Sequence, residues 1–173
     1  KEIDYIIGDQ HVTPLENRSQ FTENILQLPN IWSCLAKPDF KIKKGNSSPA
    51  LKNGFITFGS FNNLSKINDN VIDVWSEILK RVENSKLFLK TKELDNLEMM
   101  ENIRKKFQKN GISTEKIITE GRSKTREEML KKYNQIDIAL DPFPYSGVTT
   151  SFESVWMGVP LLTKKGNNFY SRI

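Results

Sequence analysis

The stretch IDIALDPFPYSGVTTSFESVWMGVPLLT, residues 136 to 163, decides the fold class of this chain. An apolar run from Ile136 to Leu140 leads into a loop rich in proline and glycine, and a second apolar run, Val159 to Thr163, closes the stretch. Between them lies a segment with the apolar spacing of a short helix. Two such runs joined through one helix are typical of a βαβ unit, in which the two strands are parallel.

The helix of this unit is expected to begin close to Thr149 or Thr150. Three residues are predicted to form its buried side: Phe152, Val155 and Trp156. Gly158 and Pro160 then turn the chain back into the sheet.

The same alternation of apolar runs and helical segments extends back to residue 54, which favours a Rossmann-like parallel sheet flanked by helices. The remaining strand candidates are Phe55 to Phe58, Lys86 to Lys90 and Lys116 to Thr119. The first connecting helix is predicted from one apolar stripe, made of Val71, Val74, Trp75, Ile78, Leu79 and Val82.

Two more helices are predicted from their ends as well as from their apolar faces. The second carries Met100, Ile103 and Phe107 on one face and stops at Asn110-Gly111, where glycine suits the left-handed residue after a helix. The third begins at Thr125, which forms a capping box with Glu128, and ends near Tyr133.

The first 53 residues follow a different pattern. We expect a strand over Ile3 to Ile7, a short helix over Glu16 to Leu26 and an apolar segment over Ile31 to Leu35. Lys37 to Asn53 has few apolar residues and reads as a loop or linker. The predicted organisation is therefore residues 1–36, a linker at 37–53, and a Rossmann-like domain at 54–173.

Composition restricts the classes of function. The 173 residues carry 26 basic and 21 acidic side chains, and this mixing argues against a nucleic-acid partner despite a net charge of +5. The basic run Arg104 to Lys106 is expected to be the solvated face of a helix. One cysteine, Cys34, and one histidine, His11, argue against a disulfide and a Cys/His zinc site, and Cys34 is expected in the core. Without an apolar run long enough to span a bilayer, a cytoplasmic protein with no membrane association is expected.

Loops that follow parallel strands are the first places to look for a ligand site. One candidate loop, residues 59 to 66, has small and amide side chains and ends in Lys66. The Lys66 ammonium could bind a diphosphate, and Asn62 and Asn63 offer hydrogen bonds. The alternative is an exposed lysine without a function.

The second candidate loop, residues 141 to 150, enters a helix. Gly147 permits close approach of a ligand, and the backbone N–H groups of Thr149 and Thr150 at a helix start attract an anion such as phosphate. Glu153 lies about one turn further and could accept hydrogen bonds from both hydroxyls of a ribose. The alternative is structural, with Thr150 and Glu153 forming a capping box.

Taken together, these motifs resemble the O-linked N-acetylglucosamine transferase and SPINDLY-type glycosyltransferase family. The matching stretches are DYIIGD at 4–9, LPN at 28–30, FGSFNNLSKI at 58–67, VWSEILKRVENSKLFL at 74–89 and DPFPYSGVTTSFESVWMGVPLLT at 141–163. The resemblance implies the two-lobed GT-B architecture, with this chain holding the C-terminal, nucleotide-sugar-binding lobe.

The resemblance also implies roles for individual residues. It assigns Lys66 to the donor diphosphate as the catalytic residue and places Asn63 in the same neighbourhood. Thr149 and Thr150 fall on the pair that binds the diphosphate through backbone amides, and Glu153 falls on the acidic position that holds the ribose.

The base-binding part of the family pattern is less well matched. Arg126 lies where the family often has a basic residue. Met129 replaces a frequent histidine that contacts the base, and Val148 replaces a histidine or glycine next to Gly147. The polar contact of that histidine is lost, although Met129 can still pack on a uracil face.

The family reaction is a metal-independent, inverting transfer of a sugar from a nucleoside diphosphate, so no cofactor and no metal are expected. The expected donor is a UDP-sugar carrying N-acetylglucosamine or a related hexose, and the expected acceptor is a protein Ser or Thr. The family's amino-terminal lobe supplies acceptor-side groups, including a histidine, and TPR repeats usually precede it. Residues 1–36 are expected to be the end of that lobe, and the chain an inactive fragment of a larger enzyme.

Two alternatives remain open at this stage. One is the same architecture with GDP-fucose or UDP-glucose as donor and a different acceptor. The other is a Rossmann-like nucleotide-binding module without transfer activity. No G-x-G-x-x-G motif follows the first strand of the domain, which counts against a dinucleotide ligand.

Overall fold

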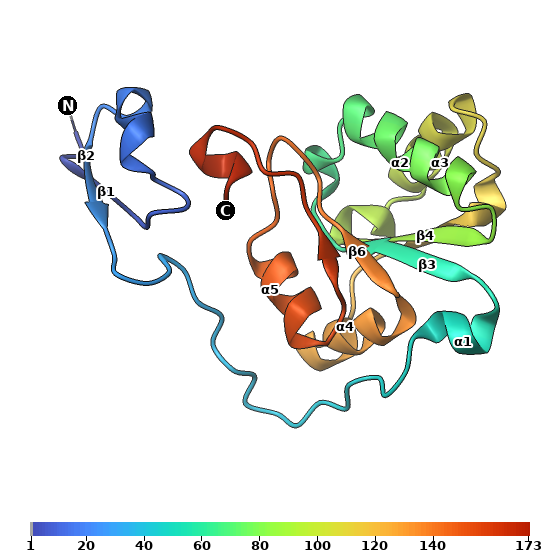
Figure 1. Cartoon of the computed structure of the whole chain (residues 1–173). Coiled ribbons are helices and arrows are strands. Elements are labelled where there is room, and N and C mark those ends of the chain that lie inside the picture. The colour runs from blue at the N-terminus through green and yellow to red at the C-terminus, as the bar shows by residue number, and fades with distance from the viewer. Residues whose placement is uncertain (1) are drawn as a thin grey trace.

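The computed structural model describes residues 2–173, and its main body is a five-stranded parallel sheet flanked by helices (Figure 1). The strand order is β5-β4-β3-β6-β7. The strands are β3 (Ile56–Ser60), β4 (Ser85–Lys90), β5 (Ile117–Glu120), β6 (Ile138–Leu140) and β7 (Leu161–Leu162). The predicted fold class is confirmed, and all five predicted strands are present with bounds shifted by one or two residues.

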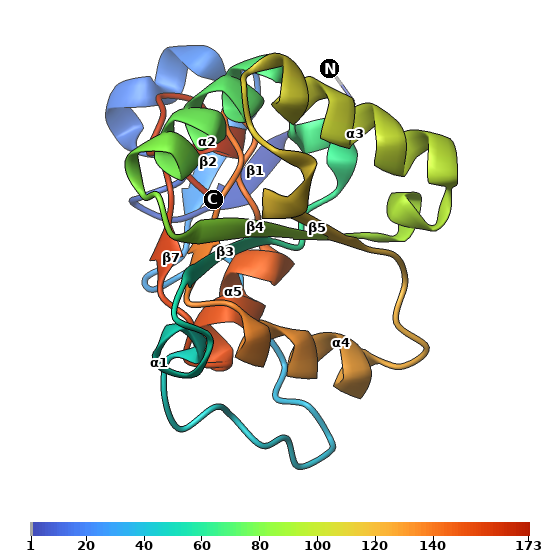
Figure 2. The same cartoon turned by 90° about the vertical axis from the view of Figure 1, so that its right-hand side faces the viewer.

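Two pairs of helices cover the two faces of this sheet, as Figure 2 shows. One face carries α2 (Asp69–Arg81) and α3 (Leu97–Lys109), and the other carries α4 (Arg126–Lys132) and α5 (Thr149–Trp156). Short 3₁₀ turns lie in the connections: η2 (Leu64–Lys66), η3 (Lys92–Asp95), η4 (Thr114–Lys116), η5 (Tyr133–Gln135) and η6 (Phe169–Ser171).

The core has two layers because side chains alternate across the sheet. On β4, Leu87 and Leu89 face the cluster under α2 and α3, which includes Trp75 and Phe107. Phe88 faces the opposite cluster, which includes Tyr133 under α4. The strands are therefore buried on both sides, as a parallel sheet requires.

The predicted helix ends are confirmed more fully than the predicted buried faces. The Thr125 side chain accepts a hydrogen bond from the Glu128 amide at 3.1 Å, and Gly111 has the left-handed φ of 80°. The Glu128 carboxylate, however, accepts from the Lys124 amide instead of closing the box on Thr125.

Two predicted core positions on the helices are wrong. Val74 is 46% exposed, because the buried stripe of α2 is centred on Val71, Trp75 and Leu79 and leaves Val74 at its edge. Val155 is 62% exposed, because the face of α5 that meets the sheet carries polar residues instead, namely Glu153 and Ser154.

The N-terminal part forms a separate two-stranded parallel sheet, β1 (Tyr5–Gly8) with β2 (Asn24–Gln27), joined through η1 (Leu15–Gln20). The helix predicted over Glu16 to Leu26 is thus wrong in its second half, where residues 21–23 are irregular and residues 24–26 belong to a strand. Residues 31 to 35 form neither helix nor strand, and Cys34 is exposed, contrary to expectation. Two strands supply no core in which the thiol could be buried.

The predicted linker lies against the five-stranded part. Asn134 accepts from the Gly45 amide at 2.8 Å and donates to the Lys43 carbonyl at 3.0 Å, and Phe40 and Ile42 pack on the core beneath α4. Its last residues form a short helix, α1 (Pro49–Asn53), although a loop was predicted there.

Candidate functional site

The sheet has one position at which the strand order reverses direction, between β3 and β6. Loops that leave adjacent strands at such a switch point diverge and form a crevice in which ligands bind. The two loops that leave here are residues 61–66 and 141–148, which are the two loops that the sequence singled out. The Lys66 ammonium donates to the Ser146 carbonyl at 2.8 Å, so the fold brings both together.

Lys66 lies at the end of η2 and is half-buried. Its ammonium is 4.2 Å from the centre of the Tyr145 ring. Burial lowers the pKa of Lys66, and the nearby Asp141 carboxylate opposes that shift. Lys66 is therefore partly buried and in contact with the second loop, whereas the alternative was an exposed lysine without a function.

The two asparagines of the first loop have different surroundings. Asn63 is exposed, and its side-chain oxygen accepts from the Ser65 amide at 3.0 Å, which caps η2. Asn62 is buried, and its side-chain oxygen accepts from the Thr150 hydroxyl at 3.0 Å. Asn62 therefore joins the two loops, whereas Asn63 stays at the rim.

The start of α5 has no side-chain cap. Val148 occupies the N-cap position without a side-chain hydrogen bond, and Thr149 and Thr150 form the first turn. The capping box proposed as the alternative for Thr150 and Glu153 is therefore absent. Gly147 is required here, since a Cβ at this position would lie 2.5 Å from the Thr150 hydroxyl.

Glu153 is 4% exposed and lies one turn into α5. Burial raises the pKa of Glu153, and the Arg126 guanidinium, 3.8 Å away, opposes the shift. A buried carboxylate with one long-range cation partner retains lone pairs for further donors. Hydroxyl groups of a ligand fit this requirement.

A cavity of about 390 Å³ opens beside Glu153, and we call it the basic cavity. Phe61 and Met129 supply apolar lining, and Thr150 and Glu153 connect it to the start of α5. Five cationic side chains line it: Lys90, Lys92, Arg122, Lys124 and Arg126. This composition suits an anionic ligand with a planar apolar group.

The ion network at the floor of the basic cavity was not predicted from the sequence. The Lys90 ammonium, which is 3% exposed, donates to Glu120 at 2.9 Å and to the Gly121 carbonyl at 2.6 Å. The Lys132 ammonium reaches the second Glu120 oxygen at 2.7 Å, so the network fastens α4 to the ends of β4 and β5. The sequence signal that could have indicated this network is the lysine at the end of an apolar strand.

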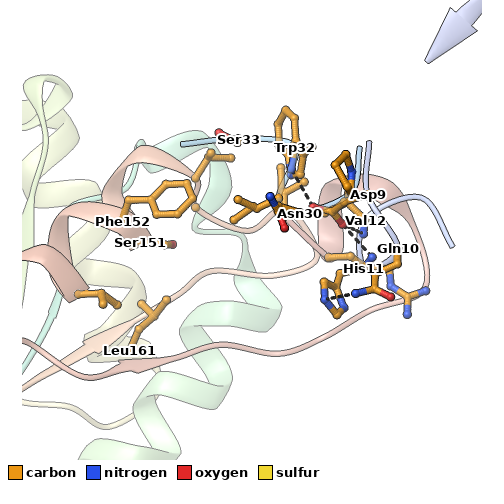
Figure 3. A pocket seen from close by; sticks show the side chains of 17 residues that line it. Asp9, Gln10, His11, Val12, Asn30, Trp32, Ser33, Ser151, Phe152 and Leu161 are labelled. Carbon is orange, nitrogen blue, oxygen red and sulfur yellow. Dashed lines mark hydrogen bonds between the residues drawn. The ribbon is translucent and has the colours of Figure 1, made fainter. Parts of the chain in front are cut away.

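A second cavity, of about 650 Å³, lies on the opposite side of α5, and we call it the apolar cavity (Figure 3). Phe152 and Leu161 lie at one end of it and His11 at the other. Gly147 and Val148 line this cavity and are absent from the lining of the basic cavity. Val148 is thus separated from Met129, although the two were predicted in one donor site.

The N-terminal wall of the apolar cavity is held by Asp9. One of its carboxylate oxygens accepts from the His11 and Val12 amides, at 2.8 and 3.0 Å, and the other accepts from the Trp32 amide at 2.9 Å. Burial alone would raise the pKa of Asp9, but these hydrogen bonds hold it below the usual value. The positions of Asp9 and His11 beside α5 were not predicted from the sequence.

Among residues 2–173, no helix combines the length and apolar character needed to cross a membrane. Within the same residues, no three side chains of His, Cys, Asp or Glu gather in a way that would hold a metal ion.

The model of glycosyl transferase family 41 matches residues 38–173. The SPINDLY protein of Eustoma exaltatum subsp. russellianum, named a probable UDP-N-acetylglucosamine–peptide N-acetylglucosaminyltransferase, is 37% identical over 164 residues, which cover 95% of this chain and 18% of that protein. The SEC protein of Arabidopsis thaliana, which carries the same enzyme name, is 31% identical over 171 residues, with 93% and 17% covered.

A solved structure is also similar over nearly the whole chain. It is a mutant O-GlcNAc transferase from Thermobaculum terrenum, with 33% identity and a TM-score of 0.86 over 98% of this chain and 31% of that one. The chain therefore spans less than a fifth of the length of the curated relatives above and about a third of this solved chain.

Proposed function

The chain belongs to glycosyl transferase family 41, and on this premise we propose that it binds the nucleoside diphosphate of a sugar donor at the β3–β6 switch point. The observation that carries the proposal is the convergence of Lys66, the uncapped start of α5 and the buried Glu153 next to the basic cavity. The names of the relatives point to UDP-N-acetylglucosamine as the donor.

Each part of the donor has a place in this arrangement. The diphosphate lies on the backbone N–H groups of Thr149 and Thr150, where the helix dipole favours negative charge, and Lys66 adds a full positive charge. Glu153 accepts hydrogen bonds from the ribose hydroxyls.

The base enters the basic cavity. Phe61 and Met129 contact its faces, and Arg126 lies at its edge. Asn63 contributes from the rim of the diphosphate site. This placement keeps the Glu153 carboxylate away from the phosphates, which it would repel.

The transfer step follows from this binding mode. The oxygen of an acceptor hydroxyl forms a bond to the anomeric carbon of the sugar, and the bond from that carbon to the diphosphate oxygen breaks. The electron pair leaves on the diphosphate, and the hydroxyl proton passes to a base on the acceptor side. Because negative charge on the diphosphate grows in the transition state, Lys66 and the α5 amides stabilise the transition state more than the bound donor.

The acceptor and the setting of the enzyme belong to the same proposal. The relatives' names include a peptide acceptor. The proposed acceptor for this protein is accordingly the hydroxyl group of a protein Ser or Thr. The family resemblance adds TPR repeats in the full-length protein, a cytoplasmic location and a reaction without a metal.

Calorimetric titration of the full-length protein with UDP, GDP and UMP tests the proposal. We expect saturable UDP binding that is weaker with UMP, because UMP lacks the second phosphate that Lys66 and α5 attract. If GDP bound more tightly than UDP, the donor would be a GDP-sugar, and the position of the proposed binding site would stand. Binding of none of the three nucleotides at millimolar concentration would refute the proposed function.

A further inference from the structure

The ammonium of Lys66 is held by the loop that carries Tyr145. It donates to the Ser146 carbonyl and lies over the Tyr145 ring, 4.2 Å from its centre. Asp141 is the nearby carboxylate, but its two oxygens accept from the Gly147 amide at 2.7 Å and the Thr163 hydroxyl at 2.8 Å. The direct neighbours of the ammonium are therefore a ring face and a carbonyl, and neither neutralises its charge.

Tyr145 is itself fixed in place. Its ring stacks on Tyr170 of η6 with ring centres 5.8 Å apart and planes 13° apart, and the Ser146 amide donates to the Tyr170 carbonyl at 3.0 Å. Tyr145 is 49% exposed and Tyr170 is 38% exposed. Two half-exposed rings bury little apolar area, so core packing alone does not account for this stack.

The stack also has support from the N-terminal part of the chain. Phe169, next to Tyr170, contacts the Trp32 ring at 5.4 Å between ring centres. The Asn167 carbonyl accepts from the side chains of Asn17 and Gln20 at 3.0 and 3.2 Å. The ring that faces Lys66 is thus held from both parts of the molecule.

We propose that Tyr145 is a positioning residue, whose ring holds the Lys66 ammonium beside the start of α5 with its charge available for the donor diphosphate. This inference rests on the proposed function. A lysine has many rotamers, and fixing it on an anion costs conformational entropy. An aromatic face attracts an ammonium and lowers that cost, whereas a carboxylate in the same place would compete with the diphosphate.

A double-mutant cycle in the full-length protein tests the role of Tyr145, with UDP release from UDP-N-acetylglucosamine as the rate measured. Tyr145→Leu is expected to lower kcat about fivefold, the scale of one cation–π contact. Tyr145→Phe is expected to stay within about twofold of the parent, because it keeps the ring. On the Lys66→Ala background, Tyr145→Leu should cause no further loss.

Three results would overturn the inference: an unchanged kcat in Tyr145→Leu, an equal loss on the Lys66→Ala background, or a loss in Tyr145→Phe as large as in Tyr145→Leu. If Tyr145→Leu fails to fold, as judged by its melting curve, Tyr170→Leu takes its place, and its loss of kcat must also vanish on the Lys66→Ala background. The proposed function fails only if no nucleotide binds to the unaltered protein. If the unaltered protein binds UDP and one of these three results is obtained, the role of Tyr145 is refuted and the proposed function stands.

Discussion

The two cavities beside α5 differ in chemistry although one helix separates them. The basic cavity is lined by five cationic side chains and reaches Glu153, whereas the apolar cavity is lined by groups such as Phe152, Val155 and Leu161. The apolar cavity is the larger of the two, at about 650 Å³ against about 390 Å³. In the proposed function the donor lies on the side of the smaller cavity, because an anion requires charge and free N–H donors more than volume.

The largest effect is expected at Lys66, where the two loops of the switch point meet. Lys66→Ala should lower kcat about a hundredfold, the scale of losing one preorganised group at a developing anion. The measurement is UDP release from UDP-N-acetylglucosamine by the full-length protein. Lys52→Ala, an exposed lysine of α1, is the matched control and should leave kcat unchanged. Equal kcat values for Lys66→Ala and the control would show that Lys66 has no role in the transfer step.

A second prediction concerns the floor of the basic cavity. Glu120→Gln should lower the free energy of unfolding by about 2 kcal/mol, because it leaves the buried Lys90 ammonium without its carboxylate. The effect is smaller than for a fully buried pair, since the Glu120 side chain is 35% exposed. Urea denaturation measures it, and Glu77→Gln, in an exposed pair with Lys80, should cost much less.

The pH dependence of this second effect has a definite sign. Burial would raise the pKa of Glu120, but the hydrogen bonds from Lys132 and Lys90 lower it below the usual value. The network therefore stabilises the fold above the unfolded-state pKa of glutamate and loses this contribution as pH falls through the folded-state pKa. The difference between the parent and Glu120→Gln should shrink in acid, and a constant difference would contradict the assignment.

A third prediction contrasts two positions on α5 that face different cavities. Glu153→Gln should weaken UDP binding about tenfold, because hydrogen bonds to a charged acceptor become hydrogen bonds to a neutral one. Val155→Ala, two residues away and facing the apolar cavity, should change UDP affinity by less than about twofold. Calorimetry of both variants checks this contrast, and equal losses would mean that the donor is not confined to the basic side.

The segments that carry Lys66, Thr149, Thr150 and Glu153 could be predicted from the sequence, because they follow strands whose apolar runs are unambiguous, whereas the two cavities could not. The ends of those strands determine where the loops lie, so the switch point follows from the strand order. The faces of α5 were harder to predict. Val155 was expected to be buried but is exposed, and Glu153 is buried instead, because a buried carboxylate interrupts the apolar periodicity on which the prediction depends.

The N-terminal part shows the opposite case. Its strand β2 falls in a segment whose pattern suggested a helix, and parallel pairing with β1 overrides that local preference. The places of Asp9 and His11 beside α5 depend on contacts between residues far apart in the chain, as with the Trp32–Phe169 pair, and no local pattern encodes such contacts.

The smallest effect is expected on the apolar side. Trp32→Ala should lower the free energy of unfolding by about 1 kcal/mol through the loss of its aromatic contact with Phe169. It should leave UDP affinity within about twofold, because Trp32 does not line the basic cavity and reaches Lys66 only indirectly, through Phe169 and the Tyr170–Tyr145 stack. Leu51→Ala, at a side chain that is 83% exposed, is the control for stability. A large loss of UDP affinity in Trp32→Ala would show that the two sides of α5 are not independent.

The most direct test of the central claim is a crystal structure of the full-length protein with UDP bound. The diphosphate is predicted on the amides of Thr149 and Thr150 beside Lys66, the ribose on Glu153, and the uracil in the basic cavity against Phe61 and Met129. Electron density for UDP in the apolar cavity, or at the switch point with its base turned away from Met129, would contradict the account.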